Sequence, residues 1–456
     1  MTAAHAASGQ SLVLTRVGAA LGLGVAFAVV LVTDRYTPGF EGPFAVIAAV
    51  GFLLLTGMLA AQLLDMVGLP HLTAYIAIGV LSGPHVLHLI DHETVAQLSP
   101  VNTLALSLIA LAGGAELRAR MLVPLRRSLS YATLLHSLPG TLLMAAAFYV
   151  CAPYLPFTRE QPARALIGIS ALWGVLAVSR SPSAMLGIFA QLKPDGPLSR
   201  FALAFVMSSD IVVAVMTTLT IALVRPLIEP MSGIAMSDLF ALAHEILGSI
   251  TLGMTCGFVL SLYLWLVSGQ LLLVLLALGF GLTEGLRYLH FDPLLTFLTA
   301  GFVVSNLSTQ GRKLLHAVEA TGSLVFVVFF ATAGAHLDIP LLARLWPLAL
   351  ALAASRVLVT YVGHRLGARL ANDEPVIRRW GWAPLVSQAG LTLGLSAVVE
   401  RAFPSFGSGF RSLVVATVAI NEVIGPILFK LALDRTGETG KSQSMVPASA
   451  RPDNEP

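Results

Sequence analysis

A single carboxylate interrupts an otherwise apolar stretch, Asp210 in FVMSSDIVVAVM. A second acid, Glu422, lies in a comparable stretch, AINEVIGP. A deprotonated carboxylate offers hard oxygen ligands to Na⁺ or K⁺, whereas a protonated one is neutral and can cross a dry barrier. One such group can hold either a monovalent cation or a proton. Asp210 is therefore the predicted cation ligand (Na⁺ or K⁺) and proton-exchanging residue.

Two arginines, Arg180 and Arg356, also lie in apolar stretches. An isolated cation at the bilayer centre costs at least ~2.5 kcal/mol, so each arginine needs a partner or a wet cavity. We predict that Arg180, Arg356 and Glu422 are charge partners, with Glu422 neutralising one arginine and leaving Asp210 free to titrate. The alternative is that Glu422 also transports, which would change the charge moved per cycle.

Small polar residues interrupt two apolar stretches, at 179–183 (Ser-Arg-Ser-Pro-Ser) and at 387–390 (Ser-Gln-Ala-Gly). Proline removes a backbone donor, and hydroxyl groups can bond the carbonyls that a break frees. The helix ends at such breaks point their partial charges at a midplane cavity. An ordinary proline kink is the alternative. The predicted break residues are Pro182, Gln388 and Gly390, and the hydroxyls predicted to complete the cation coordination are those of Ser179, Ser181 and Ser209.

The composition places these residues in a membrane protein. Of the 456 residues 56% are hydrophobic and only 11% charged, whereas a soluble domain carries about 25% charged residues. No basic stripe with interleaved aromatic residues is present, so nucleic-acid binding is not expected. No cofactor motif, HExxH or GxGD pattern is present either, so we expect neither a cofactor nor an enzyme.

Apolar runs long enough to span a bilayer predict an all-α polytopic protein with about 13–14 transmembrane helices. The first run follows Arg16 as in a signal peptide, but no A-x-A site follows Val32, so a retained helix is predicted over 1–42. The fourteen candidate spans are 17–33, 43–65, 70–90, 95–116, 127–152, 164–182, 197–225, 237–268, 270–288, 293–306, 313–335, 341–366, 380–400 and 410–433.

The basic residues orient these spans. With a cytoplasmic N-terminus, 17 of the 27 Lys and Arg residues fall in inside loops and 8 in outside loops. Cytoplasmic loops are enriched in Lys and Arg. We therefore predict a multi-pass protein of the inner (plasma) membrane with both termini in the cytoplasm. The polar segment 434–456 is predicted to be a disordered cytoplasmic tail.

The transmembrane domain, 43–433, contains two halves with matching features in the same order. Pro70 and Gly79 correspond to Pro293 and Gly301, and the break residue Arg180 corresponds to Gln388. The run Ala112–Leu117 corresponds to Thr332–Leu337 in the same way. The topology makes the halves inverted six-helix repeats, 43–225 and 270–433, joined by a linker helix over 237–268.

The chain resembles the monovalent cation:proton antiporter superfamily, the sodium/hydrogen exchanger family in its broad sense. Leu69-Pro70 with Gly79 and Gly83-Pro84 is similar to that family's LxLPxxxGYLxxGxxxGP stretch, and Val328–Asp338 to its FFxxxGxxLD element. The resemblance covers roughly 43–433 and favours a potassium-efflux-antiporter-like branch without the soluble regulatory domain. It implies the sodium/proton antiporter fold with crossed discontinuous helices, and a homodimer built from a scaffold domain and a moving ion-binding domain.

The same resemblance implies roles for individual residues. Asp210 matches the family's essential aspartate, and Arg356 matches its basic residue on the fourth helix of the second half. Ser209 replaces the usual amide or carboxylate, and Arg180-Ser181-Pro182 replaces Thr-Asp-Pro. The predicted function is electroneutral exchange of Na⁺ or K⁺ for H⁺ across the lipid bilayer by alternating access at Asp210. A cation channel or a transport-dead sensor on the same fold is the alternative.

Overall fold

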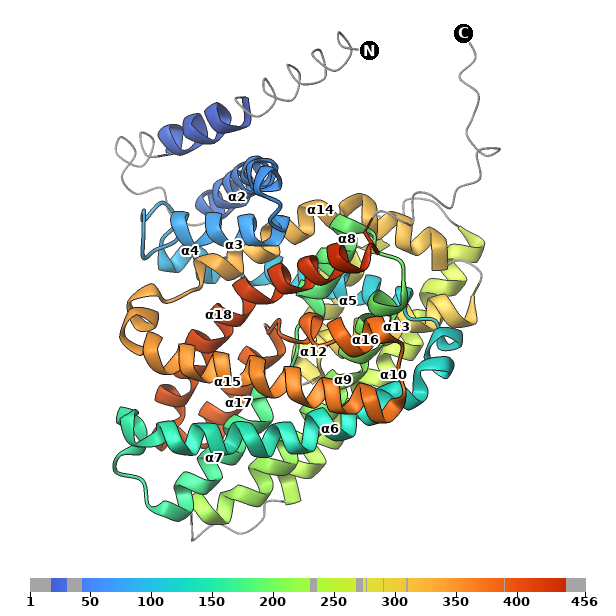
Figure 1. Ribbon diagram of the computed structural model, residues 1–456. Helices are drawn as coiled ribbons and strands as arrows, with labels where there is room; N and C mark the ends of the chain where they lie inside the picture. The colour runs from blue at the N-terminus through green and yellow to red at the C-terminus, as the bar shows by residue number, and fades with distance from the viewer. Residues whose placement is uncertain are drawn as a thin grey trace, which may run out of the picture. The chain divides into compact units, whose positions relative to one another are not determined.

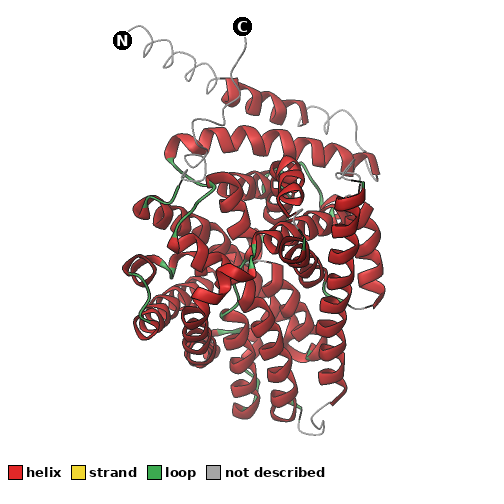
Figure 2. Cartoon of the chain, turned by 90° about the vertical axis from the view of Figure 1, so that its right-hand side faces the viewer, coloured by secondary structure: helices red, strands yellow, loops and turns green. Residues whose placement is uncertain are grey.

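The computed structural model describes residues 18–30, 43–229, 236–267, 274–275, 277–289, 291–308, 311–388 and 390–439. These residues form helices joined by short loops, and no strand occurs among them (Figure 2). Seven of the helices are long and apolar enough to cross a membrane, and five shorter apolar helices accompany them. The predicted all-α membrane fold is confirmed. Of the predicted N-terminal helix, 18–30 is helical and the rest of 1–42 lies outside the described residues.

The chain forms two compact units, and each draws helices from both predicted repeats. Unit 1 comprises Met1–Ala115 and Ser249–Arg344, and unit 2 comprises Glu116–Gly248 and Leu345–Pro456. The unit boundaries fall inside α5 (Ser99–Glu116), α10 (Met236–Leu266) and α15 (Ile339–Ala371). The repeat boundaries remain a prediction from sequence.

Two helices of unit 1, α4 (His92–Gln97) and α13 (Pro293–Leu307), begin at a side-chain cap. Asp91 accepts a hydrogen bond from Thr94 N at 2.8 Å before α4, and Asp292 accepts one from Leu295 N at 2.6 Å before α13. Besides parts of α5, α10 and α15, its elements are α2 (Pro43–Leu64), η1 (Asp65–Val67), α3 (His71–Ser82), α4 (His92–Gln97), the π-helix η4 (Leu278–Leu282), α12 (Thr283–Leu289), α13 (Pro293–Leu307) and α14 (Gly311–Ala335).

Two helix pairs in unit 1 pack backbone against backbone through reciprocal glycines. A Cβ added to Gly79 of α3 would overlap the Ala331 carbonyl of α14, and one added to Gly334 of α14 would overlap the Ile76 carbonyl of α3. The pair α5 and α13 repeats the pattern, with Gly114 against Leu298 and Gly301 against Leu111. Small residues allow such close approach of membrane helices. The motif glycines therefore set helix spacing.

Unit 2 holds every residue that was predicted to do chemistry. Its helices include two long ones that carry Asp210 and Glu422, α9 (Pro197–Ile228) and α18 (Pro404–Thr436) (Figure 1). Besides parts of α10 and α15, its elements are α6 (Ala119–Cys151), η2 (Ala152–Tyr154), η3 (Pro156–Thr158), α7 (Ala163–Ala177), α8 (Pro182–Leu192), α9 (Pro197–Ile228), α16 (Pro375–Trp380), η5 (Ala383–Leu385), α17 (Gly390–Ala402) and α18 (Pro404–Thr436).

Side-chain packing and a close helix pair hold unit 2 together. Phe148 stacks on Trp173 with ring centroids 5.2 Å apart, and Phe410 meets Trp173 edge-on at 5.9 Å. Helices α6 and α15 run side by side (Figure 1), because Gly363 and Gly367 of α15 present no side chain to the α6 carbonyls. These contacts hold α15, which carries Arg356, against α6, and join α6 to α7 and α7 to α18.

The end of α18 differs from the expected disordered tail. The helix runs to Thr436, Gly437 ends it with a left-handed φ of 64°, and Glu438 is buried. The Glu438 carboxylate accepts hydrogen bonds from Leu198 N at 2.9 Å and Ser199 N at 2.8 Å. It thus satisfies free donors at the N-terminus of α9, where a negative charge is favourable. Residues 440–456 of the predicted tail lie outside the described residues.

Candidate ion-exchange site

The first predicted break lies between α7 and α8 in unit 2. Helix α7 ends at Ala177, and α8 begins at Pro182, whose ring suits the first helical position. Ser181 caps α8, since its Oγ accepts a hydrogen bond from Ala184 N at 3.1 Å. The backbone between the two helices is not helical, which leaves carbonyls at the end of α7 without helical partners.

The second break lies between η5 and α17, and α18 approaches it closely. The backbone leaves the helical turn after Leu385, and α17 begins at Gly390; residue 389 lies outside the described residues. A Cβ on Gly425 of α18 would come within 2.5 Å of Ser387 Cα. The absence of a side chain at Gly425 therefore allows α18 to pass directly beside the break. Gln388 is 2% exposed at this point.

Arg356 of α15 joins the two breaks. At the first break its guanidinium donates from Nε to Ala177 O at 2.6 Å and from Nη2 to Ser179 O at 2.6 Å. At the second break Nη1 donates to Val386 O, and Nη2 also donates to Leu385 O at 3.3 Å. All four acceptors are backbone carbonyls near helix ends, where the partial charge is negative. One buried cation thereby satisfies acceptors that both interruptions leave free.

This arrangement corrects the predicted pairing of charges. Glu422 is buried, with 4% of its surface exposed. Among the described residues it forms no ion pair with Arg356 or Arg180, and no hydrogen bond to its carboxylate is found there. The reason is geometric, because the carbonyls of the two breaks surround the Arg356 guanidinium and accept its hydrogen bonds. Sequence spacing could not reveal that carbonyls, rather than an acid, are its partners.

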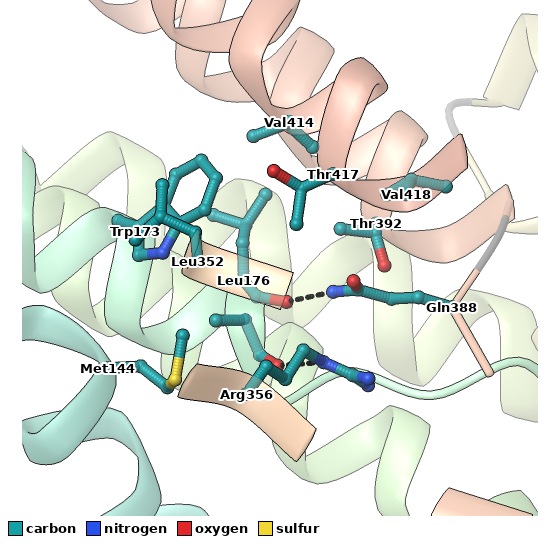
Figure 3. Close-up of a pocket in the computed structure, with 11 residues that line it drawn as sticks. Met144, Trp173, Leu176, Leu352, Arg356, Gln388, Thr392, Val414, Thr417 and Val418 are labelled. Atoms are coloured by element: carbon teal, nitrogen blue, oxygen red, sulfur yellow. Dashed lines mark hydrogen bonds between the residues drawn. The ribbon is translucent and has the colours of Figure 1, made fainter. Parts of the chain in front are cut away.

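A chain of polar side chains also crosses between the breaks. Gln388 Nε2 donates to Leu176 O at 3.0 Å and to Ser179 Oγ at 3.2 Å, while Gln388 Oε1 accepts from Asn421 Nδ2 at 2.9 Å. Ser179 Oγ also donates to Leu176 O at 2.8 Å and contacts Thr392 Oγ1. Figure 3 shows Gln388 reaching the Leu176 carbonyl above Arg356. Side chains of α17 and α18 are thus tied to the end of α7.

A small cavity lies beside this network. Its walls include Leu176, Arg356, Gln388, Thr392 and Thr417 (Figure 3). The centre of a water molecule can occupy about 10 Å³ of it, which is roughly the space that one water needs. The cavity offers polar partners from both breaks but no room for a hydrated ion.

Arg180 faces a different set of groups. It is fully buried, its Nη2 donates to His136 Nδ1 at 2.5 Å, and its guanidinium carbon lies 4.3 Å from the centre of the Phe205 ring. Because a guanidinium only donates, His136 Nδ1 must be the acceptor and the imidazole is neutral. Its Nε2 then carries the proton and lies 3.3 Å from Thr360 Oγ1. The first break thus contributes a cation to the interior between α6 and α9.

Helix α9 carries the predicted exchanging pair. Ser209 is 1% exposed, and its hydroxyl donates to Val206 O at 2.8 Å. Asp210 follows it in the same helix, and its side chain lies outside the described part of the structure. Phe205, which covers Arg180, precedes Ser209 by one helical turn. The helix therefore places position 209 on the face that also bears the Arg180 contact.

Sequence reasoning missed several residues that the structure brings to the breaks. His136, Thr392 and Asn421 were not predicted, although each is a polar group in an apolar run. Asn421 directly precedes Glu422, and its amide is 1% exposed. The usable signal was the polar residue itself, because a buried polar group in a membrane helix needs a partner.

Comparison with known proteins shows which family the chain belongs to. The family model described as sodium/hydrogen exchanger, transmembrane, matches residues 50–434. A structure of the sodium proton antiporter MjNhaP1 from Methanocaldococcus jannaschii at pH 8 matches with a TM-score of 0.61 at 16% sequence identity, covering 86% of this chain and 96% of that one. No curated protein matches the chain in sequence. The family match spans most of the chain and the fold agrees with it, so the protein belongs to the sodium/hydrogen exchanger transmembrane family.

Proposed function

We propose that the protein exchanges Na⁺ or K⁺ for H⁺ by alternating access, with Asp210 as the single exchanging carboxylate. The main observation in support is that Arg356 donates hydrogen bonds to four backbone carbonyls at the two breaks. A cation used in this way stabilises the interrupted helices, because all three guanidinium nitrogens donate to backbone carbonyls. That supports an Asp210 that is occupied by a proton or by a metal ion in turn.

The hydroxyl groups around the breaks supply the remaining oxygen ligands in this proposal. Ser209 Oγ donates to a helix carbonyl, which leaves its lone pairs for a cation. Ser181 Oγ already caps α8, and Ser179 Oγ is shared among Leu176, Gln388 and Thr392. We therefore rank Ser209 as the principal hydroxyl ligand. Ser181 and Ser179 act first as supports of the break.

One carboxylate that alternates between one cation and one proton gives electroneutral 1:1 exchange. The buried Glu422 is the group that would change this stoichiometry if it also took part. We further propose that the protein acts as a homodimer in the inner membrane with both termini in the cytoplasm. The distribution of Lys and Arg between loops supports the orientation, and family membership supports cation and proton as substrates.

The test is transport by purified protein in proteoliposomes under an imposed pH gradient. A pH-sensitive dye inside the vesicles reports gradient collapse on addition of Na⁺, K⁺ or Li⁺. We expect collapse with wild type and none with Asp210→Asn. Asp434→Asn is the matched control, since Asp434 is exposed and pairs with Lys430 at 3.1 Å near the end of α18; it is expected to transport like wild type.

Three outcomes would contradict parts of the proposal. Equal transport by wild type and Asp210→Asn would remove Asp210 from the exchange. A rate that follows an imposed membrane potential would exclude electroneutrality, and Glu422→Gln would then show whether the second acid carries the extra charge. Single-channel currents in planar bilayers would replace exchange with a channel mechanism.

A further inference from the structure

An arginine-lined pocket lies at the end of α15, away from the two breaks. It is an open pocket of about 430 Å³ formed by Arg365, Arg369, Pro375, Arg378 and Arg379. Arg365 and Arg369 are one turn apart on α15, and Arg378 and Arg379 belong to α16. Arg365 and Arg378 are half-buried, whereas Arg369 and Arg379 are exposed. Four guanidinium groups therefore surround one space that solvent or lipid can enter.

The walls of the pocket are fixed by the turn between the two helices. Asn372 adopts a left-handed φ of 60°, and the Asp373 N–H donates to Ala368 O at 2.9 Å. Farther in, His364 Nε2 donates to Ile377 O at 2.8 Å and so ties α16 back to α15. The arginines thus project from backbone that is already positioned, which reduces the entropy lost when a ligand is bound.

The charges in the pocket are only partly balanced from within the protein, by an electrostatic interaction between Arg378 and Asp373. None of the four arginines forms an ion pair with any residue that the structure describes. Asp373 and Glu374 lie in the turn between α15 and α16; Asp373 also accepts a hydrogen bond from Ser128 Oγ at 3.0 Å, and Glu374 is exposed. Arg365 donates to the hydroxyl of Tyr361 at 2.7 Å. Clustered like charges of this kind favour a multivalent anion.

The guanidinium groups of the pocket and its position near the membrane surface indicate which anion it would bind. The planar guanidinium group matches the oxygens of a phosphate in a two-point contact. Helix α15 is a candidate membrane span over Leu342–Ala371, so the arginines occupy its last turns and the connection beyond it. The rings of Tyr361 and Trp382 meet at 5.4 Å beside this end, and aromatic residues are enriched at the membrane–water interface. Basic pockets there are suited to lipid headgroups.

We propose that this pocket binds a phosphate group, with the headgroup of an anionic phospholipid as its source. A bound phosphate bridges the end of α15, the helix that carries Arg356, to α16, which leads into the second break. Lipid binding at this point would therefore stabilise the segment from α16 to Gln388. This inference concerns a second ligand site and does not depend on which residue exchanges the cation.

The test is lipid-dependent thermal unfolding of the full chain in detergent, followed by tryptophan fluorescence. Phosphatidylglycerol should raise the melting temperature of wild type, and phosphatidylcholine should not. In Arg378→Gln/Arg379→Gln the apparent affinity for phosphatidylglycerol should fall roughly 30-fold, because each basic residue near an anionic lipid contributes about 5-fold. The matched control is Arg118→Gln/Arg120→Gln, which removes two arginines outside the pocket and should keep the wild-type affinity.

Each result decides a distinct point. If inorganic phosphate alone reproduces the shift in wild type but not in Arg378→Gln/Arg379→Gln, the site stands and free phosphate is its source. The same phosphatidylglycerol response in the pocket and control variants, or none in wild type, would overturn the proposal.

Should the glutamine variant fail to fold, Arg378→Lys/Arg379→Lys keeps the charge and loses the two-point contact. Its affinity should lie below that of wild type, and an unchanged affinity would overturn the guanidinium role.

Discussion

The two units differ in how closely equivalent positions of the predicted repeats resemble each other: they make matching contacts in unit 1 and different contacts in unit 2. In unit 1, Gly79 and Gly301 occupy equivalent positions, and each leaves room for a carbonyl of the helix packed against it. Their partners, Gly334 and Gly114, are also equivalent to one another and do the same in return. Helix α3 therefore packs on α14 as α13 packs on α5. The symmetry that the sequence suggested is visible as two matching contacts.

In unit 2 the equivalent positions of the breaks have diverged. Arg180 donates to His136 and covers Phe205, whereas Gln388 reaches across to Leu176 and Ser179 at the other break. A cation at position 388 would stand beside Arg356, which already donates to the Leu385 and Val386 carbonyls. Like charges buried together are costly. The close helix contact thus recurs in both repeats, whereas the two break positions carry an arginine in one repeat and a glutamine in the other.

The largest expected effect comes from removing the cation that serves both breaks. Arg356→Ala should lower the free energy of unfolding by about 3–5 kcal/mol, because four buried carbonyls would each lose a partner at about 1 kcal/mol or more. Arg356→Lys keeps the charge but has no fork to reach both breaks, so an intermediate loss is expected. Thermal and denaturant unfolding in detergent measure both.

The control for this pair is Arg344→Ala, an exposed arginine near the start of the same helix. It should change stability by less than about 0.5 kcal/mol. If Arg356→Ala were as stable as Arg344→Ala, the hydrogen bonds to the breaks would not hold them.

The next effect tests the symmetry of unit 1. Gly79→Ala and Gly301→Ala each place a Cβ onto a backbone carbonyl, so each should destabilise by about 1–3 kcal/mol. The comparison requires the two losses to agree within about 0.5 kcal/mol. Gly51→Ala in α2 has open space around its Cβ and should be neutral or slightly stabilising. Unequal losses at Gly79 and Gly301, measured by melting temperature, would break the proposed equivalence.

The smallest effect concerns the amide pair that ties α18 to the second break. Gln388→Leu and Asn421→Leu should each cost about 1–2 kcal/mol, since each leaves a buried polar group without its partner. In a double-mutant cycle the two losses should not add, and a coupling of about 0.5–1.5 kcal/mol is expected. Strict additivity would show that the 2.9 Å contact between the two amides contributes nothing to stability.

Much of the fold could be predicted from residue type and order. Long apolar runs with few charged residues predict membrane helices, because charged residues are costly to bury in lipid. Helices α6, α9, α10, α15 and α18 appear where such runs were found. Small polar residues and Pro182 predicted the first break, and the structure places it between α7 and α8. The second break was also predicted, and a short 3₁₀ turn precedes it.

The partners inside the candidate site could not be predicted in the same way. Arg356 was expected beside an acid, because a sequence shows charged side chains but hides the carbonyls that a broken helix exposes. His136 and Asn421 lie far along the chain from the breaks that they contact, and no local pattern connects them. The order at the start of the predicted tail, 434–439, could not be foreseen for the same reason, since Glu438 is buried where α18 ends against the start of α9.

The sequence alone determined that this is a membrane protein. It also determined which segments are helical, which acids and bases lie within the helices, and where two helices are interrupted. Those properties depend on the free energy of moving each residue type into lipid and on local backbone geometry. The tertiary structure alone decided which groups contact the buried arginines: four carbonyls at Arg356, and among others an imidazole and an aromatic ring at Arg180. A hydrogen bond depends on distance and direction between segments far apart in the chain, and only folding sets these.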